Sequence, residues 1–176
     1  NGGAIAAMTK RFLFHGCLVI ILSAFFVQAE TKLPSILGSH MVLQQGEKCP
    51  IWGWDEAGTE VTVSFTGQSH TAKAGKDGRW QIILTAMKAN PKGAALTIKG
   101  SSTVKLEDVL VGEVWLCSGQ SNMEWTVSRS ANPKEEIANG NHPLIRHIKI
   151  PHKLSPKPQD NVPSSGWQPC TPKVVA

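Results

Sequence analysis

The chain has 176 residues, enough for one domain of ordinary size or for a small domain and part of a second. Its hydrophobic content of 41% and charged content of 18% are those of a globular protein and exclude a disordered or fibrous one. The net charge of +5 is modest and is not gathered in a basic run with interleaved aromatic residues, so no nucleic-acid partner is expected.

The amino-terminal stretch, residues 1–29, is interpreted as an upstream extension and a signal peptide. The basic pair Lys10 and Arg11 precedes an apolar stretch at residues 12–27, which ends in the small-x-small cleavage pattern Val27-Gln28-Ala29. A membrane anchor is the alternative, but the apolar stretch is shorter than the ~20 residues that a spanning helix needs. We therefore predict export, to a secreted or periplasmic location, with no stable membrane insertion after cleavage.

Cys49, Cys117 and Cys170 follow the predicted cleavage site. Three cysteines in an exported chain cannot all pair with one another, and none of them has the C-x-x-C spacing of a zinc site. Because they are few and far apart, we expect buried free thiols in place of a disulfide framework. Cys117 is expected to end a buried strand, where a thiol is inert.

Residues 30–107 are predicted to form an all-β sandwich domain. Short segments that alternate apolar and polar residues recur every ~8–12 residues, with turn residues between them. VTVSF at 61–65 is such a segment, and RWQIIL at 79–84 follows Gly75-Lys76-Asp77-Gly78, whose Asp-Gly pair predicts a hairpin. Further strands are predicted in CPIWGW, SHTAKA, ALTIK and STVKLE.

From residue 108 onward the pattern changes and indicates the beginning of an α/β domain. VLVGEVWLC at 109–117 is nearly continuous in apolar residues, as is typical of a strand covered on both faces in a parallel sheet. A helical stretch after Ser121 and the strand-like LIRHIKI at 144–150 would continue a βαβ order. A doubly wound domain needs several more strands and helices than residues 108–176 supply, so a truncated domain is expected.

CSGQSNMEW, at 117–125, is the candidate site. Ser121 stands where the predicted strand gives way to a helix, and the free N–H groups and the dipole of a first helical turn would stabilise an oxyanion there. Gly119 would let a substrate approach the backbone, whereas Met123 replaces the second glycine of a G-x-S-x-G elbow and disfavours an α/β-hydrolase. Ser121 and Glu124 also fit an S-x-x-E capping box, so the residues alone leave a nucleophile and a helix cap both open.

LVGEVWLCSGQSNMEW, at 110–125, resembles the nucleophile block of the sialate O-acetylesterase family, which belongs to the SGNH (GDSL-like) hydrolases. LPSILGSHMVLQQGEKCPIWGW, at 33–54, resembles the opening segment of that family, and DGRWQIIL resembles its β-domain hairpin. NHPLIRHIKIP and the later GWQPCTP resemble the region that follows the serine. The resemblance therefore extends over nearly all of the chain after residue 29.

The resemblance implies an α/β SGNH-hydrolase (flavodoxin-like) domain, of which only the beginning is present, preceded by an all-β sandwich domain. It implies removal of O-acetyl groups from sugars, typically sialic acid, through the nucleophile Ser121, whose own amide would help to form the oxyanion hole. Gly119, Gln120 and Asn122 match supporting positions. No metal or organic cofactor is expected, and the partner would be an acetylated sugar or glycan. The catalytic aspartate and histidine of the family lie beyond residue 176, so the fragment by itself is expected to be inactive or nearly so.

Two other functions stay open at this stage. One is an acetylxylan or other polysaccharide deacetylase with the same serine turn. The other is a non-catalytic, secreted, sugar-binding β-sandwich in which Ser121 only caps a helix. Trp52 and Trp54 lie on one face of a predicted strand and could offer a sugar platform, although packing is the commoner fate of tryptophan in a small sandwich.

The remaining candidates for metal ligands are His142, His147 and His152. Their spacing of five residues places neighbours on opposite faces of an extended strand, so their rings do not converge easily. We interpret all three as surface or loop histidines and predict no metal site.

Overall fold

The structure is a computed structural model that describes residues 30–175. The predicted signal peptide therefore lies outside the described residues. Among the described residues, no helix is both long enough and apolar enough to cross a membrane. In chain order the elements are β1 Val42–Gln44, β2 Cys49–Trp54, β3 Glu60–Phe65, β4 Gln68–Lys73, β5 Arg79–Leu84, β6 Asn90–Lys99, β7 Thr103–Gly112, η1 Ser121–Glu124, η2 Val127–Arg129, α1 Pro133–Asn139, β8 His142–His147, β9 Gln168–Cys170 and α2 Pro172–Val175.

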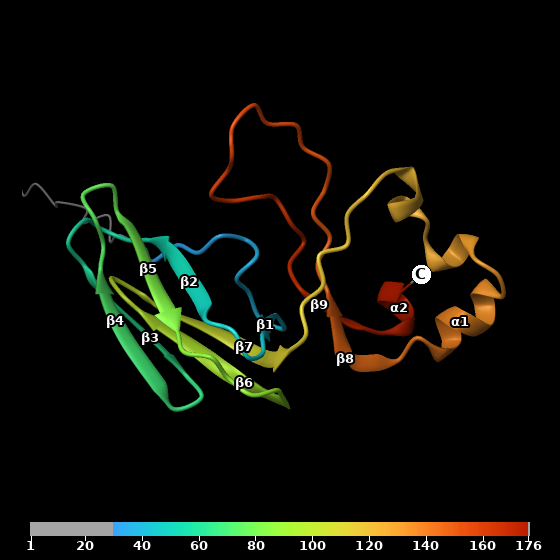
Figure 1. Cartoon of the computed structure of the whole chain (residues 1–176), viewed down its shortest axis with the longest axis horizontal. Coiled ribbons are helices and arrows are strands. Elements are labelled where there is room, and N and C mark those ends of the chain that lie inside the picture. The colour runs from blue at the N-terminus through green and yellow to red at the C-terminus, as the bar shows by residue number, and fades with distance from the viewer. Residues whose placement is uncertain (1–29, 176) are drawn as a thin grey trace, which may run out of the picture.

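Two sheets form the larger part of the molecule (Figure 1). The first has five strands in the order β1-β7-β6-β3-β4, and the second pairs β2 with β5. The β1–β7 pair is parallel, and every other strand pair in residues 30–175 is antiparallel. β8 and β9 form a separate two-stranded sheet beside the short helices.

The hydrophobic core lies between the two sheets and is built from alternate residues of their strands. On β3 the buried positions are Val61, Val63 and Phe65, and on β5 they are Trp80, Ile82 and Leu84. The alternation predicted for residues 61–65 and 79–84 is therefore confirmed, because a strand that covers a core on one face buries every second side chain. Trp80 packs in this core, at 2% exposure.

The predicted hairpin at Asp77-Gly78 is wrong, although the turn itself forms. Gly78 has the left-handed φ of 77° that the turn requires, and its amide donates to the Gly75 carbonyl. The two strands that the turn joins enter different sheets, because β5 pairs with β2 from Cys49↔Leu84 to Trp54↔Arg79. The turn therefore links the two layers of the core instead of closing one ladder.

The single strand expected over residues 109–117 is also not seen. β7 runs from Thr103 to Gly112 through the predicted domain boundary at 107/108, and residues 113–119 follow it as exposed chain without regular structure. β8 pairs with β9 and not with β7, so a parallel α/β sheet is not formed within the described residues. The division into domains stays a prediction.

The elements after β7 form a small packed unit of their own. α1 begins with Pro133 after Asn132, which has a left-handed φ of 52°, and α2 packs against α1. The buried Cys170 thiol of β9 lies 3.4 Å from the carbonyl oxygen of Gly140, as a weak hydrogen bond. A Cβ on Gly140 would overlap Val175 of α2, so this glycine allows the close approach of the two helices.

Candidate functional site

Residues 113–125, here called the serine segment, leave the five-stranded sheet at the end of β7. The Glu113 carboxylate accepts hydrogen bonds from the side-chain amides of Gln44 and Gln45, and the Val114 amide donates to Gln44 Oε1 at 2.8 Å. The hydrogen bonds from Gln45 and then Gln44 hold the pKa of Glu113 below its usual range. The start of the serine segment is thus tied to β1 and the residue that follows it.

Ser121 is the first residue of the 3₁₀-helix η1, and both of its neighbours in the motif, Gln120 and Asn122, are exposed like Ser121 itself. The N-cap position belongs to Gln120, and no side chain makes a cap hydrogen bond there. The capping box considered from the sequence is therefore not formed. Glu124 does not reach back to Ser121 but lies with its carboxylate 3.3 Å from His152 Nε2.

The serine hydroxyl is free among the described residues, and so are two amides beside it. The Met123 amide donates to the Gln120 carbonyl at 2.9 Å, whereas the amides of Ser121 and Asn122 have no acceptor within residues 30–175. Exposed N–H groups at the first turn of a helix are the kind of donor that stabilises an oxyanion. Gly119 lies against Met123, whose Cγ would be 3.0 Å from a Cβ placed on that glycine.

Within residues 30–175, Ser121 has no hydrogen-bonded histidine or carboxylate. His142, His147 and His152 are all exposed, which confirms their prediction as surface histidines. The described residues also contain no group of three or more His, Cys, Asp or Glu side chains that could hold a metal ion. The structure therefore places the predicted nucleophile in the open without bringing a general base to it.

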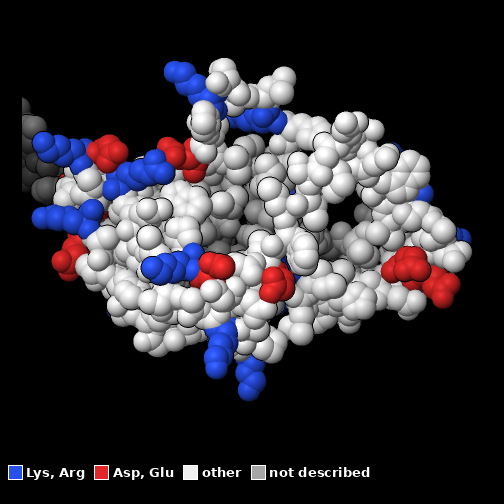
Figure 2. Space-filling model, viewed as in Figure 1, with Lys and Arg blue, Asp and Glu red and all other residues white. Residues whose placement is uncertain are grey.

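Exposed large apolar side chains are concentrated in the serine segment and in the chain that follows it. In the folded chain these side chains are Val114, Trp115, Leu116, Met123, Trp125, Leu144, Ile145, Ile150 and Leu154. Trp115 is 82% exposed and Leu116 is 95% exposed, whereas in the two larger sheets, β1-β7-β6-β3-β4 and β2-β5, Ile83 is the exposed large apolar residue. Figure 2 shows that this end of the molecule is hollowed and carries few charges on the face in view. Contiguous exposed apolar patches mark surfaces that bind another polypeptide, a membrane or a ligand.

The structure also tests the expectations about the cysteines and about the tryptophans of β2. Cys117 was expected to end a buried strand, yet it is exposed and free because the strand stops at Gly112. Cys49 and Cys170 are buried free thiols, as predicted. Trp52 and Trp54 of β2 are half-buried, and Trp52 lines a pocket of about 90 Å³ with residues of the loop at 159–162.

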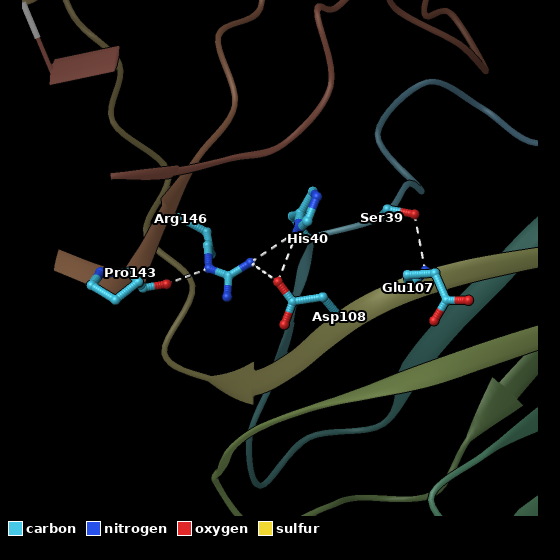
Figure 3. A network of polar contacts seen from close by, with 6 residues as sticks. All are labelled: Ser39, His40, Glu107, Asp108, Pro143 and Arg146. Carbon is cyan, nitrogen blue, oxygen red and sulfur yellow. Dashed lines mark hydrogen bonds and ion pairs between the residues drawn. The ribbon is translucent and has the colours of Figure 1, made fainter. Parts of the chain in front are cut away.

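One polar cluster was not found from the sequence: His40, Asp108 and Arg146 (Figure 3). Arg146 Nη1 donates to Asp108 Oδ2 at 2.6 Å, and His40 Nδ1 lies 2.7 Å from the same oxygen. The hydrogen bond from Arg146, followed by that from His40, holds the pKa of Asp108 below its usual range. His40 and Asp108 have left-handed φ values of 67° and 55°, a conformation in which His and Asp are over-represented, but the sequence pattern gives no sign of it.

Comparison with known proteins gives a consistent set of relatives. Over 120 residues, 61% of this chain, the sequence is 37% identical to a sialate O-acetylesterase of Rattus norvegicus, and over 122 residues it is 37% identical to one of Homo sapiens. The fold matches the crystal structure of a carbohydrate acetylesterase from Xanthomonas citri with a TM-score of 0.79 and 34% identity over 83% of this chain. No family model matches the chain. The resemblance to the sialate O-acetylesterase family is thereby confirmed.

The match covers only part of each relative. It spans 22% of the rat protein, 23% of the human protein and 34% of the chain in the Xanthomonas structure. The relatives therefore contain much polypeptide to which this chain has no counterpart.

Proposed function

We propose that this chain is part of a carbohydrate O-acetylesterase and supplies its serine nucleophile, Ser121. The proposal is carried by the fold match to a carbohydrate acetylesterase over 83% of the chain, and the curated relatives are named sialate O-acetylesterases. The exposed hydroxyl of Ser121 and the free amides of Ser121 and Asn122 are compatible with that role. Export through a signal peptide at residues 1–29 is part of the same proposal.

In the proposed reaction, Ser121 Oγ attacks the carbonyl carbon of an acetyl ester, and its proton passes to a general base. Collapse of the tetrahedral intermediate breaks the bond to the sugar oxygen, which leaves as the protonated hydroxyl, and the acetyl group stays on the serine. Water then releases acetate and restores Ser121. The amides of Ser121 and Asn122 would face the oxyanion, with Gln120 and Gly119 shaping the turn.

The general base would come from polypeptide outside this chain, as an aspartate-oriented histidine. The exposed apolar side chains of the serine segment support this, since a further part of the catalytic domain would cover them. They are Val114, Trp115, Leu116, Met123 and Trp125. The fragment by itself is then expected to be inactive or nearly so, because loss of triad members costs serine hydrolases many orders of magnitude in rate.

The test is hydrolysis of an aryl acetate and of O-acetylated sialic acid by the full-length protein and its Ser121→Ala variant. We expect the variant to lose turnover and to keep its thermal midpoint, because the serine makes no cap hydrogen bond. Full activity of the variant would refute the nucleophile assignment. Acetylated xylan in the same assay distinguishes a polysaccharide deacetylase from a sialate esterase, and a full-length protein that binds sugars without hydrolysis would be a binding module.

A further inference from the structure

The cluster of His40, Asp108 and Arg146 joins β8 to the five-stranded sheet (Figure 3). The Arg146 side chain is only 5% exposed, and its Nε donates to the Pro143 carbonyl at 2.6 Å while Nη1 donates to Asp108. A guanidinium withdrawn from water to this extent needs a counter-ion, because an unpaired buried charge is strongly destabilising. Asp108 is that counter-ion.

The proton positions in the cluster follow from its donors and acceptors. His40 Nδ1 lies 2.7 Å from Asp108 Oδ2 and 3.3 Å from Arg146 Nη1. Arginine can only donate, and one ring nitrogen cannot accept from Arg146 and donate to Asp108 at the same time. The contact with Asp108 is the shorter one, so we assign the proton to His40 Nδ1, which donates to Asp108. The contact with Arg146 is then not a hydrogen bond. Asp108 Oδ2 therefore receives two hydrogen bonds from two different parts of the chain.

Apolar packing does little to hold β8 against the sheet. Leu144 of β8 faces the end of β7 across a hollow of about 320 Å³, lined also by residues 89–91 and 110–112. Among the described residues, Arg146 is the one residue of β8, β9, α1 and α2 whose side chain hydrogen-bonds to the five-stranded sheet. The residue before β9 adds a second anchor, because Trp167 packs against the core and its Nε1 donates to the Ile36 carbonyl at 2.8 Å. The polar cluster is thus the anchor that β8 itself supplies.

A series of contacts between neighbouring elements connects β8 to the serine turn. β8 pairs with β9, and α2, which follows β9, packs against α1. α1 packs against η2, which begins three residues after η1 ends and so follows the serine turn closely. At its other end the serine segment is tied to the sheet through Glu113.

We propose that His40, Asp108 and Arg146 are positioning residues for the reaction assigned to Ser121. They hold the β8 side of the unit formed by β8, β9, α1, α2 and η2, whose β9 side is held through Trp167. In this way they set the position of the serine turn relative to β7. His40 and Asp108 both have a left-handed backbone. Such strained positions persist where the surrounding structure requires them, often beside functional sites. This inference rests on the proposed esterase function.

The test compares Asp108→Asn and Arg146→Lys with Asp160→Asn in the full-length protein. Asparagine tolerates the left-handed backbone at position 108, so the first variant removes charge without changing the turn. Asp160 is the matched control. It pairs with Arg79 at 2.9 Å and also joins the later part of the chain to the sheets, but both side chains of this pair are about half exposed. Ile51→Ala serves as a second control, because it weakens the core away from the cluster.

We expect kcat to fall about 10- to 100-fold in Asp108→Asn, as is usual when a catalytic group is displaced by about 1 Å, with KM nearly unchanged. Arg146→Lys should lie between this variant and wild type, and Asp160→Asn and Ile51→Ala should keep wild-type kcat at 25 °C. Hydrogen exchange provides a readout without activity. The hydrogen-bonded amides of the serine segment, those of Val114, Met123 and Trp125, should exchange faster in Asp108→Asn than in Asp160→Asn.

Unchanged exchange of the Val114, Met123 and Trp125 amides in Asp108→Asn would overturn the positioning role, and so would an equal loss of kcat in Ile51→Ala. Wild-type protein that hydrolyses no acetyl ester would instead refute the proposed function. In that case the exchange comparison still decides whether the cluster positions the serine segment.

Discussion

Gly93 of β6 lies against the carboxylate of Asp108 of β7, so close that a Cβ at position 93 would collide with Asp108 Oδ1. The β6–β7 ladder shifts register on either side of Ala94, and this irregularity lets Asp108 turn away from the sheet toward Arg146. Strand pairing in the sheet is therefore irregular at the point where the polar cluster forms.

Gly93→Ala should destabilise the protein by about 1–3 kcal/mol, the usual effect of forcing extra atoms into an occupied site. Urea unfolding measures this change. Gly38→Ala is the control, because nothing lies within 4 Å of a Cβ at that position. Equal stability of the two variants would mean that Asp108 moves aside freely.

The Asp108 ion pair predicts a dependence of stability on pH. The folded pKa of Asp108 lies below its ordinary value of 3.8, so the stabilisation is complete above that value and is lost as the pH falls through the lower folded pKa. The difference in urea midpoint between wild type and Asp108→Asn should be constant from about pH 7 to about pH 5 and shrink below 3.8. A difference that does not shrink as the pH falls below 3.8 would contradict this assignment.

Ile51 of β2 has no exposed surface, and it lies at the centre of the core between the sheets. Ile51→Ala should cost about 2–5 kcal/mol, since it removes buried methyl groups and leaves a cavity. Ile83→Ala is the contrast: this residue of β5 is 53% exposed on the opposite face, and its truncation should cost much less. Denaturant unfolding of the two variants measures both changes in the free energy of unfolding. Similar losses in the two variants would contradict the burial of Ile51 and the exposure of Ile83.

Cys117 should be the fast-reacting thiol of residues 30–175, because it is exposed while Cys49 and Cys170 are buried. Burial also raises the pKa of the Cys49 thiol, so less of the reactive thiolate is present there. With a disulfide reagent under native conditions, Cys117→Ser should remove one fast-reacting equivalent and Cys49→Ser none. Loss of the fast phase in Cys49→Ser would contradict the described burial.

Trp115 and Leu116 should contribute to binding of a hydrophobic dye by this 176-residue chain. The double variant Trp115→Ser/Leu116→Ser should bind less dye and keep its thermal midpoint, because neither side chain packs in the core. In the full-length protein the same double variant should lower the midpoint if further polypeptide covers the two side chains. An unchanged midpoint there would argue that this surface stays open.

Most strands of the two sheets could be predicted from sequence because each of these is specified locally. The short strand β1 was not among the predicted strands, and β7 continues to Gly112, past the predicted STVKLE strand. In EVTVSF and RWQIIL the two-residue alternation of apolar side chains both defines a strand and selects its buried face. The motif around Ser121 was equally visible, because its residue types and its resemblance to known esterases lie within one short stretch.

What local pattern could not decide is which segments meet. The Asp77-Gly78 turn has the chemistry of a hairpin, yet β5 pairs with β2 because the core between two sheets is better closed that way. The apolar run at 109–117 has the composition of a buried strand, yet residues 113–117 are exposed, since a strand needs partners that residues 30–175 do not offer. The ion pair of Asp108 and Arg146 joins residues 38 positions apart and rests on two left-handed backbones, which only tertiary structure places together. Sequence thus determined most of the strands and the candidate nucleophile, and tertiary structure decided the strand pairing and the contacts that hold the serine segment.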